Sequence, residues 1–195
     1  MTPLLLATNN KHKVEEIRHF LSGLPYVVRS LADIPNGPVT VEDAPTLEGN
    51  ALKKAREAFA ESGMLSMADD TGLEVQALGM RPGVYSARYA GEGATYHDNC
   101  VKLLEELQGV PEEKRRAQFR TVIAIVGREF EGTVEGKVEG MILTALRGEQ
   151  GFGYDPLFVP DGHSRSYAEM TIGEKNTLSH RARALEKAVT ILSSL

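Results

Sequence analysis

Two adjacent carboxylates, Asp69 and Asp70, lie between apolar segments at 64–67 and 73–77. Like charges this close raise each other's pKa, and burial adds to the cost of ionising them. A bound cation would offset that cost, and Mg²⁺ takes one or two protein carboxylates together with phosphate oxygens and water. A plain polar turn, with Gly72 at a positive φ, explains the pattern equally well. In both interpretations the acidic pair occupies a turn after a strand.

A polar segment at 8–13 follows a short apolar run at 4–7, which is typical of a buried strand. Apolar residues between Val14 and Leu24 then recur at helical spacing. A residue at the start of the segment can cap this helix: Thr8, Asn9 or Asn10. The free N–H groups of a helix N-terminus and two nearby lysines favour phosphate. The alternative is an ordinary cap with solvated lysines, and no P-loop pattern occurs in the sequence.

Two further segments have the apolar spacing of helices. The first is predicted from Asn50 to Ser62, ends at Gly63, and carries Lys53 and Lys54 on its polar side. The second is predicted over 95–108, where Thr95 and Asp98 resemble a capping box. Cys100 lies on the apolar stripe of the second helix, which indicates a core position rather than a reactive thiol.

The segments 117–126 and 130–142 predict strands joined by a short turn, and therefore antiparallel pairing. Because other strands alternate with helices, we expect a mixed sheet in an α/β fold. The connection 79–91 is rich in Gly, Tyr and Arg, and a loop of this length is often functional.

The glycine-rich segment 151–160 contains Phe152, whose flat face suits a nucleobase. Such stacking is worth about 1–3 kcal/mol in single-strand binding proteins. A core aromatic in a glycine-rich turn is the alternative. His180 and Arg181 fall in the first turn of a C-terminal helix whose apolar residues run from Leu178 to Leu192. Cations there oppose the helix dipole, so an anionic or carbonyl-bearing ligand is expected to compensate.

The composition is that of a soluble globular protein: 195 residues, 42% apolar and 25% charged, with a net charge of −5. The negative charge argues against broad nucleic-acid binding, and no apolar run is long enough to cross a membrane. The single cysteine and the absence of a signal peptide pattern indicate the cytoplasm. We expect one domain over residues 1–195, with two lobes.

Several of these segments together resemble the inosine triphosphate pyrophosphatase family, which includes the bacterial dITP/XTP pyrophosphatases. The resemblance covers essentially the whole chain and rests on motifs in family order: Ala7–Lys13, Ala68–Leu73, Pro82–Tyr89, Gly151–Phe158 and Ser179–Arg181.

The resemblance implies Mg²⁺-dependent hydrolysis of ITP, dITP and XTP to the monophosphate and pyrophosphate, which removes deaminated purines from the nucleotide pool. It also implies a homodimer with no nucleic-acid or membrane partner. The implied fold is a long mixed β-sheet flanked by helices, with two lobes and a central active-site cleft.

The resemblance also assigns roles to residues. Asp70 corresponds to the general base and a metal ligand, and Glu42 to the other metal position. The substrate contacts it implies are Thr8, Asn9, Asn10, Lys11, His12, Lys13, Thr71, Phe152, Gly153, Tyr154, Asp155, Lys175, His180 and Arg181. Many relatives carry Glu-Asn-Ala where this chain has Gly49-Asn50-Ala51, so Glu42 or Glu48 must complete the metal site here.

Two other functions fit part of the pattern. One is a general Mg²⁺-dependent phosphohydrolase in which Asp69 or Asp70 becomes phosphorylated. The other is a nucleotide-binding sensor without turnover, which would keep the lysines and Phe152 but has no need for Asp70 beside a metal.

Overall fold

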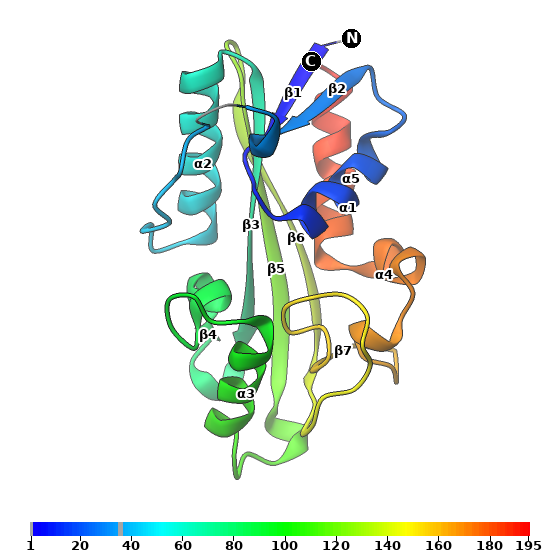
Figure 1. Cartoon of the computed structure of the whole chain (residues 1–195). Coiled ribbons are helices and arrows are strands. Elements are labelled where there is room, and N and C mark those ends of the chain that lie inside the picture. Colours follow the sequence, from blue (N-terminus) through cyan, green and yellow to red (C-terminus); the bar gives the residue numbers. More distant parts are fainter. Residues whose placement is uncertain (1, 35–36) are drawn as a thin grey trace. The chain divides into compact units, whose positions relative to one another are not determined.

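The computed structural model describes residues 2–34 and 37–195 (Figure 1). The helices are α1 (Lys11–Leu21), α2 (Leu47–Ser62), α3 (Tyr96–Glu106), α4 (Ile172–Leu178) and α5 (His180–Leu192). The strands are β1 (Thr2–Leu6), β2 (Tyr26–Ser30), β3 (Leu65–Val75), β4 (Arg81–Pro82), β5 (Arg116–Val126), β6 (Glu131–Ile142) and β7 (Phe158–Pro160).

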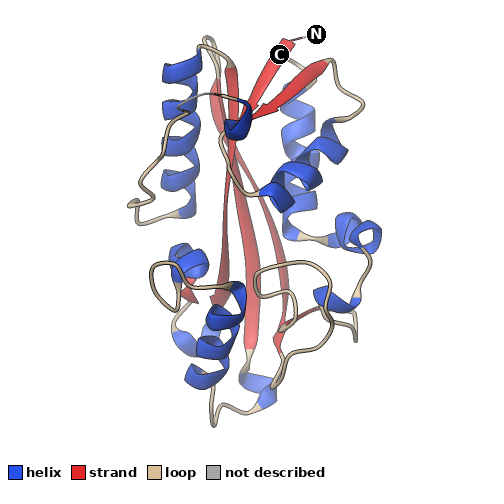
Figure 2. Ribbon diagram, in the orientation of Figure 1, coloured by secondary structure: helices blue, strands red, loops and turns tan. Residues whose placement is uncertain are grey.

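The strands form one mixed sheet in the order β2-β1-β3-β5-β6-β7, and β4 pairs with β3 (Figure 2). β1 is parallel to both β2 and β3, whereas β7 is antiparallel to β6. A short turn joins β5 to β6, closed by a 2.8 Å hydrogen bond from Gly127 N to Phe130 O. Such a short connection requires antiparallel strands. The predicted α/β fold, with a mixed sheet flanked by helices, is confirmed.

The chain divides into two compact units. The first unit comprises the described residues of Met1–Asp70, Thr121–Gly136 and Ala182–Leu195, and the second comprises Thr71–Arg120 and Lys137–Arg181. β3, β5 and β6 each contribute residues to both units. Each unit has its own apolar core. Core residues of the first include Leu4, Ile17, Ile123 and Leu185, and those of the second include Leu73, Leu103, Phe119 and Phe158.

The acidic pair does not lie in a turn, so this prediction is wrong. β3 runs without interruption through Asp69, Asp70 and Gly72, and Gly72 does not take a positive φ. The glycine is needed for a different reason: a Cβ at this position would lie only 2.7 Å from the carbonyl oxygen of Gly83. Gly72 therefore lets another backbone segment approach the strand, a common role for glycine within strands.

The helix boundaries follow local capping signals. α2 begins at Leu47 rather than at the predicted Asn50, because the Thr46 hydroxyl accepts a hydrogen bond from Gly49 N and caps the helix. The predicted capping box of Thr95 and Asp98 is confirmed at α3. Cys100 is confirmed as a core residue with 2% exposure, and burial raises the pKa of its thiol to about 12.

Two segments contain more elements of secondary structure than the sequence predicted. The connection 79–91 contains β4 and a short 3₁₀-helix at Gly83–Arg88. The C-terminal segment folds as two helices, because α4 ends at Leu178 and α5 starts at His180. Leu178 therefore belongs to α4 and packs against the core of the second unit.

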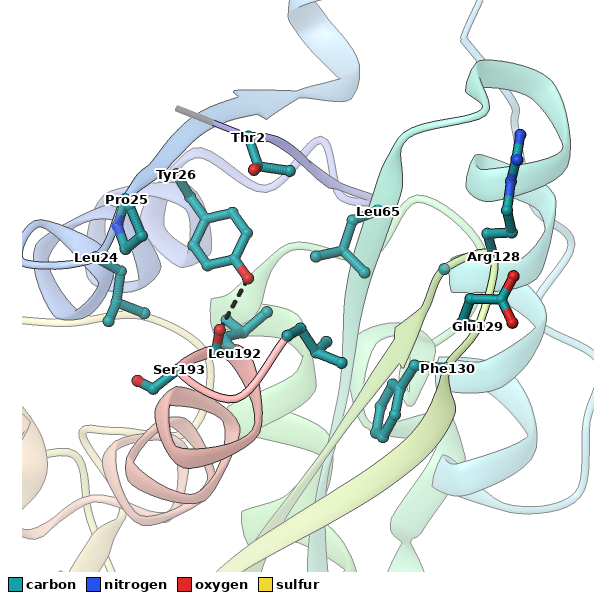
Figure 3. Close-up of a pocket in the computed structure, with 12 residues that line it drawn as sticks. Thr2, Leu24, Pro25, Tyr26, Leu65, Arg128, Glu129, Phe130, Leu192 and Ser193 are labelled. Atoms are coloured by element: carbon teal, nitrogen blue, oxygen red, sulfur yellow. Dashed lines mark hydrogen bonds between the residues drawn. The ribbon is translucent and has the colours of Figure 1, made fainter.

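A cavity of about 450 Å³ lies in the first unit, where β1, β2, the β5–β6 turn and the end of α5 meet (Figure 3). Leu24, Leu65 and Phe130 give it a largely apolar lining, and the Tyr26 hydroxyl donates a 2.8 Å hydrogen bond to Leu192 O. No candidate site residue is among the described residues that line it. Within residues 2–34 and 37–195, the helices are too short or too polar to cross a membrane.

Replacing Gly72 with alanine is expected to lower the free energy of unfolding by about 1–3 kcal/mol, the usual cost of overpacking. The added methyl group would press on the Gly83 carbonyl oxygen at 2.7 Å. Gly173→Ala is the matched control, because the nearest atom to its new Cβ would be Thr171 Oγ1 at 4.0 Å. Urea denaturation followed by circular dichroism measures both, and equal stability of the two variants would contradict the expectation.

Candidate functional site

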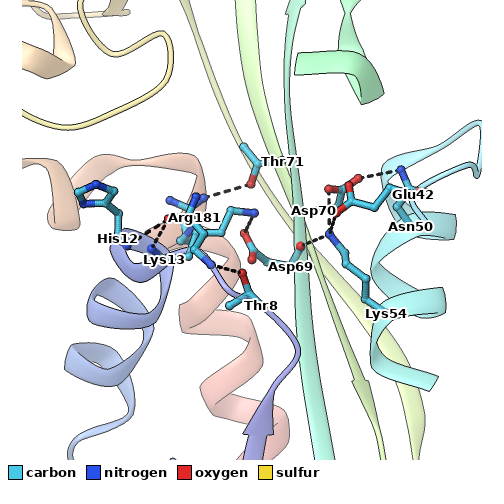
Figure 4. A network of polar contacts seen from close by, with 11 residues as sticks. Thr8, His12, Lys13, Glu42, Asn50, Lys54, Asp69, Asp70, Thr71 and Arg181 are labelled. Atoms are coloured by element: carbon cyan, nitrogen blue, oxygen red, sulfur yellow. Dashed lines mark hydrogen bonds and ion pairs between the residues drawn. The ribbon is translucent and has the colours of Figure 1, made fainter. Parts of the chain in front are cut away.

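Asp69 and Asp70 lie in the middle of β3 and are 2% and 6% exposed. Successive side chains of a strand point to opposite faces of the sheet, so each carboxylate has its own partner (Figure 4). Lys13 Nζ, from α1, lies 3.0 Å from Asp69 Oδ2. Lys54 Nζ, from α2, lies 3.1 Å from Asp70 Oδ1. A turn would have brought both carboxylates to one place, whereas the strand separates them.

Lys54 is the centre of the contacts around Asp70. Its ammonium group also lies 3.2 Å from Glu42 Oε1 and donates a 2.8 Å hydrogen bond to the carbonyl oxygen of Asp69. Although Lys54 lies on the predicted polar side of its helix, it is buried, with only 8% of its surface exposed. Lys54 faces the buried Asp70 carboxylate rather than water. Glu42, Lys54 and Asp70 thus meet within the first unit.

Asn50 completes this group from one turn earlier on α2. Its Nδ2 donates a 3.2 Å hydrogen bond to Asp70 Oδ2, and its Oδ1 accepts a 3.0 Å hydrogen bond from Ala44 N. From the sequence, Asn50 was predicted to start a helix and was given no role in the site. The available signal was the spacing between Asn50 and Lys54, since residues four apart share one face of a helix.

The charges around Asp70 alter its protonation. Burial is the main cause that raises the pKa of Asp70, and the negative charge of Glu42 raises it further. The positive charge of Lys54 lowers the pKa of Asp70, but the net result is a raised pKa. Burial alone would lower the pKa of Lys54, but the negative charges of Asp70 and Glu42 outweigh burial and raise it. Asp70 is therefore a better proton acceptor than an ordinary aspartate, as suits a general base.

The segment before α1 folds around Asn10, which is the N-cap. Asn10 Oδ1 accepts hydrogen bonds from His12 N at 3.1 Å and Lys13 N at 3.4 Å, and Asn10 N donates to Thr8 Oγ1 at 3.1 Å. Lys13 extends from this turn to Asp69. The remaining predicted contacts of the segment have exposed side chains: Asn9, Lys11 and His12. A helix N-terminus with lysines is therefore present, as the phosphate hypothesis requires.

The residues around Asp70 fit a divalent cation. The carboxylates of Glu42 and Asp70 both contact the ammonium group of Lys54, so two oxygen-bearing side chains lie close together here. Across residues 2–34 and 37–195, no three acidic, histidine or cysteine side chains are grouped closely enough to hold a metal by themselves. Glu42 and Asp70 would therefore hold Mg²⁺ only with phosphate oxygens and water as further ligands, which is its usual coordination in nucleotide sites.

In the second unit, Asp155 holds the glycine-rich loop in place. Its Oδ2 accepts hydrogen bonds from Phe152 N at 2.9 Å and from Lys175 Nζ at 2.7 Å. Asp155 and Lys175 are 2% and 5% exposed, so the pair is buried. Gly151 makes this arrangement possible, because a Cβ there would overlap the same carboxylate oxygen. Asp155 thus fixes both the loop and the lysine.

Cationic side chains surround the half-buried ring of Phe152. Lys175 Nζ lies 4.6 Å and Arg181 Cζ 5.4 Å from the ring centroid. The Tyr96 ring centroid lies 5.9 Å from that of Phe152. Arg181 is 2% exposed, and its Nη2 lies 3.3 Å from Thr71 Oγ1. This group, called the Phe152 cluster below, combines a flat apolar face with hydrogen-bond donors.

Of the other predicted contacts of the second unit, Tyr154 and His180 have buried side chains, and Gly153 contributes a backbone contact. The Tyr154 hydroxyl donates a 2.9 Å hydrogen bond to Ser86 O, and burial raises the pKa of Tyr154. Gly153 O accepts from Cys100 Sγ at 3.4 Å. His180 is 3% exposed, and its ring stacks on Phe119 at a centroid distance of 4.5 Å. These side chains support the Phe152 cluster from the core of the unit.

Comparison with known proteins gives a consistent result. The model of the Ham1 family matches residues 4–191. A protein of Thermoanaerobacter sp. (strain X514) named dITP/XTP pyrophosphatase is 53% identical over 184 residues, covering 94% of this chain and 93% of the relative. One of the same name from Desulforamulus reducens is 49% identical over 195 residues, covering 98% and 96%.

Solved structures agree with the sequence relatives. The structure of a HAM1 protein from Coxiella burnetii is 37% identical, covers 100% of both chains and has a TM-score of 0.92. A dITP/XTP pyrophosphatase structure from Mycobacterium abscessus is 40% identical, covers 96% of this chain and 99% of the other, and has a TM-score of 0.80. With the family match over almost the whole length, the chain belongs to the Ham1 family.

Proposed function

We propose that this chain is a nucleoside triphosphate pyrophosphatase that hydrolyses the non-standard purine nucleotides dITP, XTP and ITP to monophosphate and pyrophosphate. The observation that carries the proposal is the buried carboxylate of Asp70, held by Lys54 and Asn50 beside Glu42. Relatives about half identical to this chain bear the name dITP/XTP pyrophosphatase, which supports the same substrate class.

The first unit would serve the triphosphate. A nucleoside triphosphate brings roughly four negative charges, which must be neutralised before a nucleophile can approach. Lys13 and the N-terminus of α1 would bind phosphate oxygens, with Thr8 and Asn10 shaping the turn. Glu42 and Asp70 would hold Mg²⁺, which when bound neutralises phosphate charge and orients the phosphates.

In the chemical step, Asp70 acts as the general base. A water oxygen bonds to the α-phosphorus, while the bond from the α-phosphorus to the oxygen bridging to the β-phosphorus breaks. Asp70 accepts the proton of the attacking water, and pyrophosphate leaves with Lys13 stabilising its charge. Lys54 and Asn50, which contact the two oxygens of Asp70, keep its carboxylate oriented for this transfer. General-base help of this kind is typically worth about 10²–10⁴-fold in rate.

The Phe152 cluster of the second unit would bind the base. The purine would stack on Phe152, while Lys175 or Arg181 donates to its 6-keto oxygen. Adenine has an amino donor at that position, which would face a cationic donor. A site with committed hydrogen-bond partners rejects such a mismatched analogue strongly. Hypoxanthine and xanthine both carry the keto acceptor, which explains why one cluster would accept both.

We extend the proposal to the assembly and location that the family resemblance implies. The chain would act as a single domain over residues 1–195, as a homodimer, in the cytoplasm. Its net charge of −5 is consistent with a small substrate rather than nucleic acid.

Product analysis with ITP, XTP, GTP and ATP tests the function directly. We expect pyrophosphate from ITP and XTP, little from ATP, and none after Mg²⁺ is removed with a chelator, because without the cation the carboxylates of Glu42 and Asp70 would repel the negatively charged triphosphate. Separate assays for pyrophosphate and orthophosphate check each substrate. Orthophosphate as the product would instead favour a phosphohydrolase with a phosphorylated aspartate, and bound but unchanged nucleotide would favour a sensor.

Replacing Asp70 with asparagine is expected to lower kcat for ITP by about 10²-fold or more, because the proton acceptor is lost. Nucleotide binding should persist, since the amide has nearly the same shape and Lys13 is unchanged. Steady-state kinetics measures the first effect and calorimetric titration with ITP the second. Undiminished turnover in this variant would contradict the role of Asp70.

Replacing Arg181 with alanine is expected to narrow the preference for ITP over ATP, measured as the ratio of their kcat/KM values. A hydrogen bond to a charged group is worth about 1.5–3 kcal/mol, so the ratio should fall by about tenfold or more. Arg183→Ala is the matched control, because Arg183 is exposed and lies on the same helix. A ratio that is the same in both variants would refute base recognition by Arg181.

A further inference from the structure

Asn50 is completely buried, and each end of its side-chain amide has a different partner. Its oxygen accepts from Ala44 N at 3.0 Å, and its nitrogen donates to Asp70 Oδ2 at 3.2 Å. A backbone N–H requires an acceptor and a carboxylate requires a donor, so the orientation of the amide is fixed by chemistry. Neither an aspartate nor an apolar side chain could serve both partners.

The contact joins the two proposed metal ligands through α2. Asn50 holds Oδ2 of Asp70, and Lys54, one turn later, holds Oδ1 (Figure 4). Both oxygens of the carboxylate are therefore fixed by the same helix. The other end of Asn50 holds the backbone at Ala44, two residues after Glu42, whose carboxylate contacts the same lysine.

A second buried asparagine, Asn99, provides a comparison in which the side chain has a purely structural role. Asn99, on α3 in the second unit, is 1% exposed and also joins its helix to a neighbouring loop. Its Oδ1 accepts from Ala90 N at 2.8 Å, and its Nδ2 donates to Ala87 O at 3.2 Å. Both of its partners are backbone groups. Asn50 differs in one respect, since its donor is directed at an ionisable side chain of the candidate site.

We propose that Asn50 is a positioning residue, which orients the Asp70 carboxylate and ties it to the segment that carries Glu42. This inference rests on the proposed function for its consequence in catalysis. Partners that orient metal-ligating and catalytic carboxylates typically contribute about 10–100-fold to activity. The effect falls on kcat rather than on KM, because Asn50 acts through Asp70 and does not touch the substrate.

The experiment compares Asn50→Ala and Asn50→Asp with Asn99→Ala and Asn99→Asp, with each protein assayed well below its unfolding temperature. The Asn50 variants should lose about 10–100-fold in kcat for ITP with little change in KM. Asn50→Asp should lose at least as much as Asn50→Ala, because it places a carboxylate against Asp70. The Asn99 variants should lose stability in urea but keep kcat.

Two kinetic outcomes would overturn the proposal: kcat losses no greater than in the Asn99 variants, or losses confined to KM. A double-mutant cycle of Asn50→Ala and Asp70→Ala on urea unfolding tests the contact without any activity. The two changes should be non-additive, whereas additive effects would overturn the contact itself. If the wild-type protein releases no pyrophosphate, the proposed function fails, and this cycle still decides whether Asn50 holds Asp70.

Discussion

The structure of the first unit depends on one constraint, the burial of two ionisable side chains, Asp69 and Asp70, in the middle of β3. Removing a carboxylate from water is expensive unless a countercharge and hydrogen bonds replace the lost solvation. β3 places Asp69 and Asp70 on opposite faces, so one helix cannot supply both partners. α1 provides Lys13 for one face, and α2 provides Lys54 for the other. The positions of both helices on the sheet are thereby linked to a pair of charges.

The second unit also buries a carboxylate and compensates it with a lysine, here in a single ion pair. Asp155 and Lys175 form a buried ion pair, and the carboxylate also binds the backbone of the loop that carries Phe152. The lysine is directed at the same time toward the Phe152 ring. A single buried carboxylate thus determines the loop conformation and the placement of a cation. In both units, groups suited to ligand binding are held by interactions that also stabilise the fold.

The sequence predicted best what depends on local pattern. The mixed α/β sheet, the Thr95–Asp98 capping box and the burial of Cys100 all follow from spacing and residue type, and the structure confirms them.

Prediction from the sequence failed where a tertiary contact overrides the local preference of the residues. The Asp-Asp-Thr-Gly segment has the composition of a turn, yet it remains a strand because lysines from two helices compensate its charges. The sequence placed Lys54 only on the polar side of its helix, and the fold alone reveals that the buried Asp70 carboxylate lies there. The contacts of Asn50 likewise depend on residues distant in sequence.

The two ion pairs of β3 have a consequence for the alignment of the strand. A shift of the strand by one residue exchanges the faces of all its side chains. Because residues 69 and 70 are identical, such a shift would still place an aspartate beside one of the two lysines. The other lysine would then face Ala68 or Thr71, neither of which carries a charge. One of the two ammonium groups would lose its aspartate partner whichever way the strand moved. Lys13 and Lys54 together therefore act as an electrostatic check on strand register, which neither could perform alone.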